Sequence, residues 1–339
     1  MTTRRLAQLV DQTLEASVVG SFTTIGPSLR RRLDHWDPFA SAKGKQIVLT
    51  GATSGLGLKA AEILVSLGAN VHLVGRNKQK LAGVVTALQD SAVAHGGSAQ
   101  GYVCDLSLLQ ETKRLLAELQ KAVPVLDVLI HNAGALLGDF TKTTEGLEQT
   151  LAVQVLSPEL LTRGLAPQLS AAKGRVITMT SGGLYSERFD LGSLEMTEAN
   201  YKGTVAYARA KRAQTLLTMT WNDDFGDEGI RAHLVHPGWA KTPGVAESLP
   251  TFSKVMGPLL RSPEEGVDTL IWLATTNDVL LEPGQLWLDR RPRPLHKLRR
   301  TKLTSGQERV AKAALHEWCE IQIAHALSTG GHPSSKPQN

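Results

Sequence analysis

The 339-residue sequence is poor in cysteine and contains no long apolar run. Its two cysteines, Cys104 and Cys319, fall in a predicted strand and in the C-terminal segment, so a disulfide framework is not expected. No apolar run reaches the roughly 18 residues that a membrane span needs. The first twenty residues lack a continuous apolar stretch and a cleavage site, which argues against a secretory signal. Together these absences favour a cytoplasmic protein.

Aromatic residues are also scarce, at 5% of the chain, and this bears on the role of its positive charge. The formal net charge is +5, and the excess lies in two segments, Arg30–Arg32 and the stretch 290–302. Basic runs are more often solvated than engaged with a partner, so we predict solvated segments. A peripheral contact with an anionic membrane is the alternative. Nucleic acid is not an expected partner, because no aromatic side chains alternate with the basic ones to stack on bases.

Short apolar runs alternate with amphipathic stretches through most of the chain. This alternation is typical of βαβ units, and a hydrophobic content of 42% is enough for one large core. We predict an α/β fold in a single domain: a Rossmann-type, doubly wound, seven-stranded parallel sheet with helices on both faces. The predicted strands are 46–50, 70–74, 100–104, 126–131, 175–180, 231–236 and 284–288. The predicted helices include 56–67, 77–91, 107–121 and 204–222.

The chain divides into four segments. Residues 45–290 carry the predicted sheet, and residues 1–44 form an N-terminal extension in which apolar residues recur at helical spacing: Leu6, Leu9, Val10, Leu14 and Val18. We predict an extra helix docked on the domain or at an oligomer contact, with a membrane-surface helix as the alternative. Residues 291–327 form a basic, helical extension, and the polar stretch 328–339 is predicted to be disordered.

A glycine-rich turn follows the first predicted strand and opens a helix. Gly51 stands where a tight turn is needed, while Gly55 and Gly57 let the backbone approach a phosphate and let the helix pack closely on the sheet. The first N–H groups of that helix can bind a pyrophosphate. We therefore predict a dinucleotide site whose turn comprises Gly51, Thr53, Ser54, Gly55, Leu56 and Gly57.

The residues after the second strand bear on which dinucleotide is bound. Sites that prefer NAD(H) place a carboxylate there to bond the ribose 2′-hydroxyl, but this segment contains Arg76 and Asn77 and no carboxylate before Asp90. An arginine fork suits a 2′-phosphate. NADP(H) is therefore the expected cofactor. The alternative is that Arg76 is an ordinary surface arginine.

Two further segments stand at strand ends where the cofactor would lie. Asp105 and Leu106 follow the third strand and are predicted to border the adenine. Asp105 has a second interpretation, as the N-cap of a helix that begins near Ser107. Residues after the fourth strand are predicted to let the strand end approach the cofactor: Asn132, Ala133 and Gly134.

Tyr207 and Lys211 stand four positions apart on a predicted helix, a spacing that stacks two side chains on one face. Reduction of a carbonyl by hydride leaves an alkoxide, which a phenol can protonate if its pKa, normally about 10, is drawn toward neutrality. A neighbouring ammonium favours the phenolate in this way. The pair predicts carbonyl–alcohol hydride transfer with Tyr207 as general acid and base, and no metal. The alternative is an ordinary helix with a partly buried tyrosine and a surface lysine.

These motifs together resemble the short-chain dehydrogenase/reductase family, in its retinol-dehydrogenase-like branch, over residues 45–290. The resemblance implies that Ser181, at the end of the fifth strand, hydrogen-bonds the substrate oxygen and stabilises the developing oxyanion. Thr180 is the alternative donor, and only one of two adjacent strand residues can point into the cleft. The resemblance also implies cofactor contacts after the sixth strand, from Pro237, Gly238, Trp239, Ala240 and Thr242.

The sequence departs from the family pattern at one catalytic position. The family has an asparagine in the helix after the fourth strand, whose main-chain carbonyl is thought to hold a water that links the lysine to solvent; Gln154 stands there. Pro158 has no N–H to bond the carbonyl of residue 154 in an α-helix, so we predict that this carbonyl is available to that water. Otherwise the substitution implies slow turnover.

The resemblance places the substrate between the loop after Ser181 and the segment after Pro237. Both supply mostly apolar side chains: Leu184, Tyr185, Phe189, Trp239, Val245 and Leu249. We therefore expect a lipophilic carbonyl or alcohol, with lid packing as the alternative role of these residues. A homodimer through the helix of Tyr207 is a further implication. The alternative functions are a catalytically impaired cofactor-binding module for interaction or regulation, a membrane-associated scaffold, and an NAD-dependent dehydrogenase.

Overall fold

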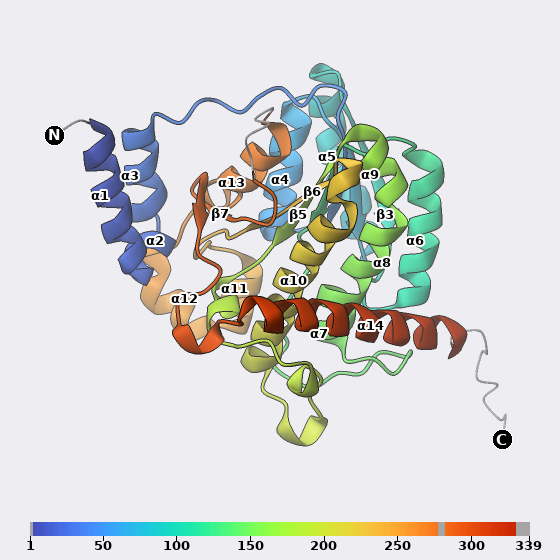
Figure 1. Cartoon of the computed structure of the whole chain (residues 1–339). Helices are drawn as coiled ribbons and strands as arrows, with labels where there is room; N and C mark the ends of the chain where they lie inside the picture. The colour runs from blue at the N-terminus through green and yellow to red at the C-terminus, as the bar shows by residue number, and fades with distance from the viewer. Residues whose placement is uncertain (1–2, 277–281, 330–339) are drawn as a thin grey trace.

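The computed structural model describes residues 3–276 and 282–329, which fold around one eight-stranded sheet (Figure 1). The strand order is β3-β2-β1-β4-β5-β6-β7-β8, with β1 to β7 parallel and β8 antiparallel to β7. The strands are β1 (Gln46–Thr50), β2 (Asn70–Gly75), β3 (Ser98–Val103), β4 (Val128–His131), β5 (Arg175–Met179), β6 (Arg231–Val235), β7 (Leu286–Leu288) and β8 (Arg291–Arg293). The strand order reverses between β1 and β4, which is where doubly wound sheets bind ligands.

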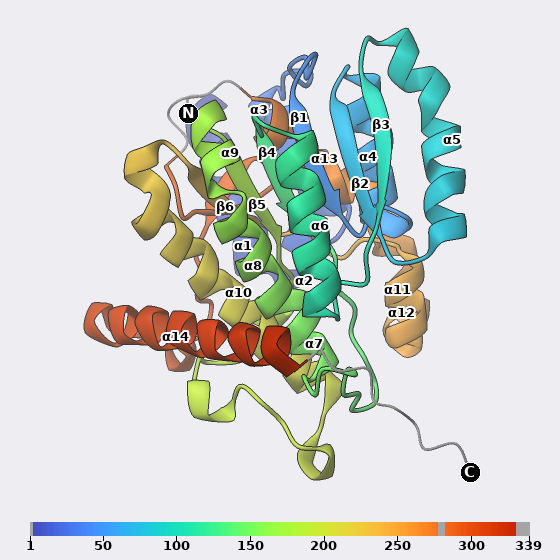
Figure 2. The ribbon, with the colours of Figure 1, turned by 90° about the vertical axis from the view of Figure 1, so that its right-hand side faces the viewer.

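Helices cover both faces of the sheet (Figures 1 and 2). One face is covered by α4 (Gly55–Ser66), α5 (Lys78–Ala94) and α13 (Pro263–Thr275), and the other by α6 (Leu109–Ala122), α8 (Ser157–Gly164) and α10 (Gly203–Phe225). Two apolar clusters hold these layers together, one containing Leu64 and Ile271 and the other containing Leu115 and Trp221, all fully buried. The predicted α/β fold is confirmed.

The remaining helices connect these layers or extend them. The other α-helices are α1 (Thr3–Ala16), α2 (Val18–Phe22), α3 (Ile25–Asp34), α7 (Gln149–Leu151), α9 (Ala166–Ala172), α11 (Pro243–Ser248), α12 (Pro250–Met256) and α14 (Ser305–Thr329). One π-helix, η1 (Ala152–Leu156), joins α7 to α8, and the 3₁₀ turns are η2 (Gly182–Tyr185), η3 (Leu191–Ser193), η4 (Glu198–Asn200), η5 (Gly226–Glu228), η6 (Gly257–Leu259) and η7 (Arg299–Thr301).

The sheet differs from the prediction at one edge, where the antiparallel strand β8 follows β7. The two strands are joined by Asp289 and Arg290, both of which have φ +55, in the left-handed region. A two-residue hairpin turn of this type needs positive φ at both positions and usually contains glycine or asparagine. The sequence has neither residue there, which is why the hairpin was not predicted.

The N-terminal extension forms three helices rather than one. Leu14 is buried, whereas Leu9 and Val18, placed on the same predicted face, are 47% and 43% exposed. The deepest contact comes from Phe22 at the end of α2, which is buried in an apolar cluster with Leu184 and Leu286. Phe22 therefore packs this segment against the domain. The side chain of Leu6 lies outside the described residues.

The two basic segments are ion-paired with acidic residues, so the prediction of solvated charge was wrong for several of them. Arg30 is 1% exposed, and its Nε lies 2.7 Å from Oδ1 of Asp11. Arg293 and Lys297 of the C-terminal segment pair with Asp11 and Glu15 of α1 at 2.8 Å and 2.5 Å. Although burial raises the pKa of Asp11, hydrogen bonds and charge from the two arginines lower it further than burial raises it. The acidic partners of Arg293 and Lys297 stand 282 positions away in sequence, so charge patterning alone could not reveal them.

The C-terminal helix α14 crosses the ends of the helices on one face of the sheet (Figure 2). Leu315, Cys319 and Ala326 are buried against α10, α6 and η1. Cys319 and Cys104 are both free thiols. The helix continues to Thr329, so the predicted disorder from residue 328 begins too early, and residues 330–339 lie outside the described residues.

Candidate active site

The turn between β1 and α4 packs so tightly that its glycines leave no room for side chains. Gly51 has φ +67, and a Cβ there would lie 2.8 Å from Cα of Ala133. A Cβ on Gly57 would lie 2.1 Å from the carbonyl oxygen of Gly51. Helix α4 begins at Gly55, and its N-cap residue Ser54 makes no side-chain capping bond. The first N–H groups of α4 therefore face the end of β1 without a side-chain cap, the arrangement that binds a pyrophosphate.

Asn132 ties the end of β4 to this turn. Its Nδ2 donates to the carbonyls of Thr50 at 3.0 Å and Gly51 at 3.2 Å, and the hydroxyl of Thr50 accepts from the main-chain N–H groups of Asn132 and Ala133. The side chain of Asn132 thus shapes the turn. Thr50 opens the glycine-rich motif of the sequence, but this role of its hydroxyl was not predicted. Gly134 makes room for Gln154, whose Cδ would lie 3.3 Å from a Cβ at that position.

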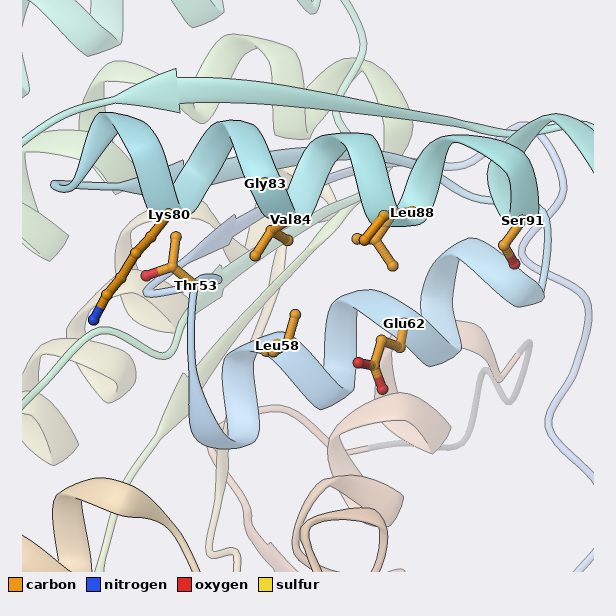
Figure 3. A pocket seen from close by; sticks show the side chains of 9 residues that line it. Thr53, Leu58, Glu62, Lys80, Gly83, Val84, Leu88 and Ser91 are labelled. Atoms are coloured by element: carbon orange, nitrogen blue, oxygen red, sulfur yellow. The ribbon is translucent and has the colours of Figure 1, made fainter.

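Two cationic side chains stand near the outer end of the turn. Arg76 follows β2 directly and is exposed, while Gly75 before it packs on Thr53, whose Cγ2 would lie 2.6 Å from a Cβ there. The side-chain oxygen of Asn77 accepts from the N–H of Lys80 at 2.9 Å and so caps α5. Figure 3 shows Lys80 extending toward Thr53 at the mouth of a groove between α4 and α5. Lys80 was not predicted as part of the site, although a second cationic residue four positions after Arg76 was a signal in the sequence.

Tyr207 and Ser181 meet at the carboxyl end of β5. Burial raises the pKa of Tyr207, and a hydrogen bond with the Ser181 side chain opposes that rise. The pKa of Tyr207 is thus raised rather than drawn toward neutrality, because burial outweighs the hydrogen bond and Lys211 does not offset it. Tyr207 is therefore protonated at neutral pH, the form that donates a proton. The Ser181 oxygen also accepts from the N–H of Gly183 at 3.2 Å. Thr180 is 2% exposed, and its hydroxyl has no hydrogen-bond partner among the described residues, so it is Ser181 that faces Tyr207.

Lys211 lies buried beside this pair. Its Nζ is 5.5 Å from the centroid of the Tyr207 ring and donates to the carbonyl of Met179 at 3.0 Å and to Oε1 of Gln214 at 2.9 Å. Burial lowers its pKa to about 7. An ammonium with this pKa can both hold charge and exchange a proton near neutral pH. The structure thus brings Ser181, Tyr207 and Lys211 together, as predicted.

The loop after β6 covers the glycine-rich turn. Thr242 lies against it, 3.5 Å from where a Cβ of Gly55 would be, and Gly238 turns with φ +72. The N-terminal extension holds this loop from behind, because the N–H of Trp239 donates to the carbonyl of Phe22 at 2.7 Å. This contact was not predicted from sequence, because no local pattern indicates a hydrogen bond between two such distant segments. Ala240, two residues before Thr242, is buried and packs toward α13.

Comparison with known proteins identifies the family. The model of the short chain dehydrogenase family matches residues 45–251. The chain belongs to the short-chain dehydrogenase family. It is 33% identical to dehydrogenase/reductase SDR family member 12 of Homo sapiens, over 75% of this chain and 79% of that one. It is 30% identical to retinol dehydrogenase 14 of Mus musculus, over 75% and 80% of the two chains. These relatives confirm the predicted retinol-dehydrogenase-like branch.

A solved structure supports the same assignment. A metagenomic short-chain oxidoreductase in complex with NADP is 27% identical and has a TM-score of 0.54, with 74% of this chain and 98% of that one covered. The chain therefore belongs to an oxidoreductase family whose fold binds a nicotinamide cofactor.

The short-chain dehydrogenase departs from a regular helix at Gln154. The N–H of Ser157 bonds the carbonyl of Ala152, five residues earlier, so η1 is a π-helix rather than the α-helix expected from sequence. Pro158 explains this widening, because it lacks the N–H that an α-helix would offer to the carbonyl of residue 154. The buried side chain of Gln154 donates from Nε2 to the carbonyl of Ala135 at 3.1 Å, and its Oε1 has no partner among the described residues. The water at the Gln154 carbonyl stays a prediction.

Asp105 does not cap a helix, so that interpretation was wrong. Helix α6 begins at Leu109, and its first N–H groups donate to the carboxylate of Glu145. Asp105 instead accepts from the N–H of Ser107 at 2.9 Å, two residues on. Because Glu145 caps the helix from 36 residues away, the local sequence around Leu109 does not predict this cap. Leu106 is 8% exposed and packs in the core beside α6.

The expected apolar wall of the substrate site is smaller than predicted. Leu184, Tyr185 and Phe189 are buried in the protein core, and the Tyr185 hydroxyl donates to the carbonyl of Pro294. Packing, the alternative role, accounts for these three. Trp239 is partly exposed and lies edge-on to Phe252 of α12, with ring centroids 5.1 Å apart. Leu249 is 37% exposed, and the side chain of Val245 lies outside the described residues.

Proposed function

We propose that the chain is an NADP(H)-dependent oxidoreductase that interconverts a carbonyl and an alcohol, with Tyr207 as the general acid and base. The hydrogen bond between Ser181 and Tyr207, with the buried Lys211 beside them, is the observation that carries this proposal. The bound nicotinamide would supply or accept the hydride. Tyr207 would give its phenolic proton to the substrate oxygen during reduction, and Ser181 would donate a hydrogen bond to the same oxygen.

The preference for NADP(H) is supported by the cationic side chains after β2. Arg76 is exposed next to the turn, and Lys80 extends toward Thr53 (Figure 3). A 2′-phosphate carries negative charge that two such groups would bind, whereas the 2′-hydroxyl of NAD(H) would leave them unpaired. The bound NADP of the metagenomic relative is consistent with this preference.

A lipophilic substrate is supported by the aromatic edge of the site. Trp239, in the loop that follows β6, and Phe252 of α12 present a partly exposed apolar surface, and Leu249 adds to it. Burying such a surface against an apolar molecule is favourable, whereas a polar molecule would lose its hydration there. One relative is a retinol dehydrogenase by name.

Peripheral membrane contact is proposed as the route by which such a substrate would arrive. Val18, Val19 and Ile25 of the N-terminal helices are at least 38% exposed, and their neighbour Thr24 bonds the carbonyl of Leu259, close to α12. No helix among the described residues could cross a bilayer. Co-sedimentation with anionic liposomes tests the contact, and a Val18→Asp, Val19→Asp variant should lose it. A homodimer through α10 has less support, because α14 packs across that helix.

The catalytic proposal is tested by titrating the protein with NADPH and NADH by cofactor fluorescence and then adding lipophilic aldehydes and ketones. Tight NADPH binding with turnover that vanishes in Tyr207→Phe is the expected result. A second candidate, a cofactor-binding module with impaired chemistry, is favoured by the buried Gln154 at the family asparagine position. Tight binding without turnover on any carbonyl, or on alcohols with NADP⁺, would favour that module.

A further inference from the structure

The ammonium of Lys211 has one amide partner in its own helix. Of its three N–H donors, one bonds the carbonyl of Met179 at the end of β5 and one bonds Oε1 of Gln214. Gln214 stands one turn after Lys211 on α10, whereas Tyr207 stands one turn before it. The third donor remains for the side on which Tyr207 lies.

The orientation of the Gln214 amide is fixed by this contact. Because an ammonium only donates, the oxygen of the amide must face Lys211 and its nitrogen must point away. Gln214 is fully buried, and its Nε2 has no hydrogen-bond partner among the described residues. A buried amide that is half satisfied is costly, so such a group usually has an ordered water as its second partner.

The helix itself does not need this amide. The carbonyl of Lys211 accepts from the hydroxyl of Thr215 at 2.9 Å, and the carbonyl of Gln214 accepts from the hydroxyl of Thr218 at 2.8 Å. The main-chain carbonyls of this turn thus accept their additional hydrogen bonds from threonine hydroxyls of α10, not from the Gln214 amide. Among the described residues the Gln214 side chain bonds only Lys211, which assigns the amide to the lysine rather than to the helix.

We propose that Gln214 is a positioning residue: its Oε1 holds the ammonium of Lys211 in register with Tyr207, and its Nε2 anchors a buried water on the far side of the lysine. This inference rests on the proposed function of Tyr207 and Lys211. A neutral amide holds Lys211 in place without cancelling its charge, so the field of the ammonium still acts on the Tyr207 phenol. A carboxylate at the same position would hold the lysine but neutralise that field.

The other titratable groups near Lys211 do not compete for this role. Tyr207 shares its helix, and His131 faces it from β4. Burial, with a smaller contribution from the charge of Lys211, lowers the pKa of His131 to about 3, so this imidazole stays neutral throughout the working range. The ring also has its own partner, the hydroxyl of Thr162 at 2.8 Å.

Two substitutions that keep the length of the side chain separate the effect of the hydrogen bond to Lys211 from the effect of charge. Gln214→Met removes the hydrogen bond, and Gln214→Glu replaces the neutral amide with a carboxylate. The ammonium is titrated directly by NMR of protein labelled with ¹³C at the lysine side chains, with Lys211→Met to assign its signal. We expect the Lys211 pKa to fall by about one unit in Gln214→Met and to rise by at least as much in Gln214→Glu. An unchanged titration in both variants would overturn the proposal.

The titration stands apart from turnover, so failure of the proposed function is distinguishable from failure of this inference. Where turnover is found, the rising limb of the pH profile for alcohol oxidation should move to higher pH in both variants. Gln214→Asn, which keeps a shorter amide, should show a smaller shift. Gln168→Met is the matched control, because Gln168 lies on α9 and also carries an amide oxygen without a partner among the described residues. A shift of equal size in the control would show a nonspecific effect and overturn the assignment. A crystal structure that shows no water at Nε2 of Gln214 would overturn the part of the proposal that concerns the anchored water.

Discussion

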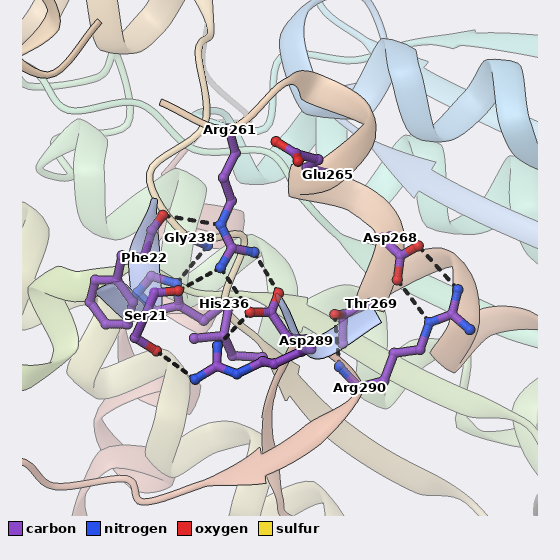
Figure 4. A network of polar contacts seen from close by, with 12 residues as sticks. Ser21, Phe22, His236, Gly238, Arg261, Glu265, Asp268, Thr269, Asp289 and Arg290 are labelled. Atoms are coloured by element: carbon purple, nitrogen blue, oxygen red, sulfur yellow. Dashed lines mark hydrogen bonds and ion pairs between the residues drawn. The ribbon is translucent and has the colours of Figure 1, made fainter. Parts of the chain in front are cut away.

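Arg261 and Asp289 form a two-pronged ion pair in the interior of the protein, with N–O distances of 2.6 Å and 3.0 Å and neither side chain more than 2% exposed (Figure 4). Asp289 is the first residue of the strained β7–β8 turn, and Arg261 packs on Gly238, where a Cβ would lie 2.1 Å from its Nε. Arg30 of α3 completes the group through its own bond to Asp289 at 2.5 Å. One carboxylate therefore links the N-terminal extension, the last hairpin and the loop over the glycine-rich turn.

Loss of the Asp289 charge should destabilise the fold strongly. In Asp289→Asn the two buried guanidinium groups of Arg30 and Arg261 share a neutral amide, and removing one partner of a buried ion pair costs about 3–5 kcal/mol. Urea unfolding followed by circular dichroism measures this as a lower midpoint. Asp34→Asn is the control, because its pair with Arg291 is about one-quarter exposed and should contribute less than about 1 kcal/mol. Equal losses in the two variants would contradict a special role for Asp289.

Buried histidines should make the protein lose stability in mild acid. Burial lowers the pKa of His72 to about 4 and of His236 to about 3, whereas an unfolded histidine has a pKa of about 6.5. Below pH 6.5 the unfolded chain therefore binds more protons than the native one, and stability falls as the pH falls toward 4. Each such histidine contributes a slope of about 1.4 kcal/mol per pH unit in that window.

The effect is measured by urea unfolding at pH 7, 6 and 5. His72→Gln should flatten the slope by about one proton, since His72 bonds Tyr102 and Gln46 from β2, away from the proposed catalytic residues. Substitution of an exposed residue that does not titrate, such as Gln100→Ala on β3, should leave the slope unchanged. A slope that is the same in His72→Gln would mean that His72 binds its proton equally well in the folded and unfolded states, against the lowered pKa.

The fold was predictable from sequence because its signals are local. Short, mostly apolar runs such as 46–50 and 70–75 are typical of buried central strands, and the ends of each predicted strand lie within two residues of the observed ones. The antiparallel strand β8 was not predicted, because its turn is stabilised by Arg30 and Arg261 rather than by turn-forming residues. Long-range charge pairing can place Asp289 and Arg290 in the left-handed region, and no local pattern carries that information.

The candidate site divides in the same way. Gly51, Tyr207 and Lys211 were predictable because their chemistry depends on spacing within one element. Gln214 is just as near in sequence, but its importance depends on the direction of a buried amide, which only packing determines. The contact of Phe22 with Trp239 joins segments more than 200 residues apart and could not be read from either of them.

Cofactor preference should depend on Arg76 and Lys80 together. Arg76→Asp places a carboxylate where a 2′-phosphate would bind and favours a ribose 2′-hydroxyl instead, so the ratio of NADPH to NADH affinity should fall by about 10- to 100-fold. Lys80→Gln should give a smaller fall, since it removes one charge without adding repulsion. Both are measured by fluorescence titration with each cofactor. Lys121→Gln, on an exposed turn of α6, is the control, and an unchanged ratio in Arg76→Asp would exclude the phosphate role.

Ser181 and Thr180 should differ sharply although they are neighbours. Ser181 shares a hydrogen bond with Tyr207, so Ser181→Ala should lower kcat by about 10²- to 10³-fold, the usual effect of removing one donor to a developing oxyanion. Thr180 carries a buried hydroxyl without a partner among the described residues, so the isosteric Thr180→Val removes an unsatisfied group and should keep or raise the unfolding free energy. Steady-state rates and urea unfolding of both variants check the pair. Equal loss of kcat in the two variants would contradict the assignment of the donor role to Ser181 alone.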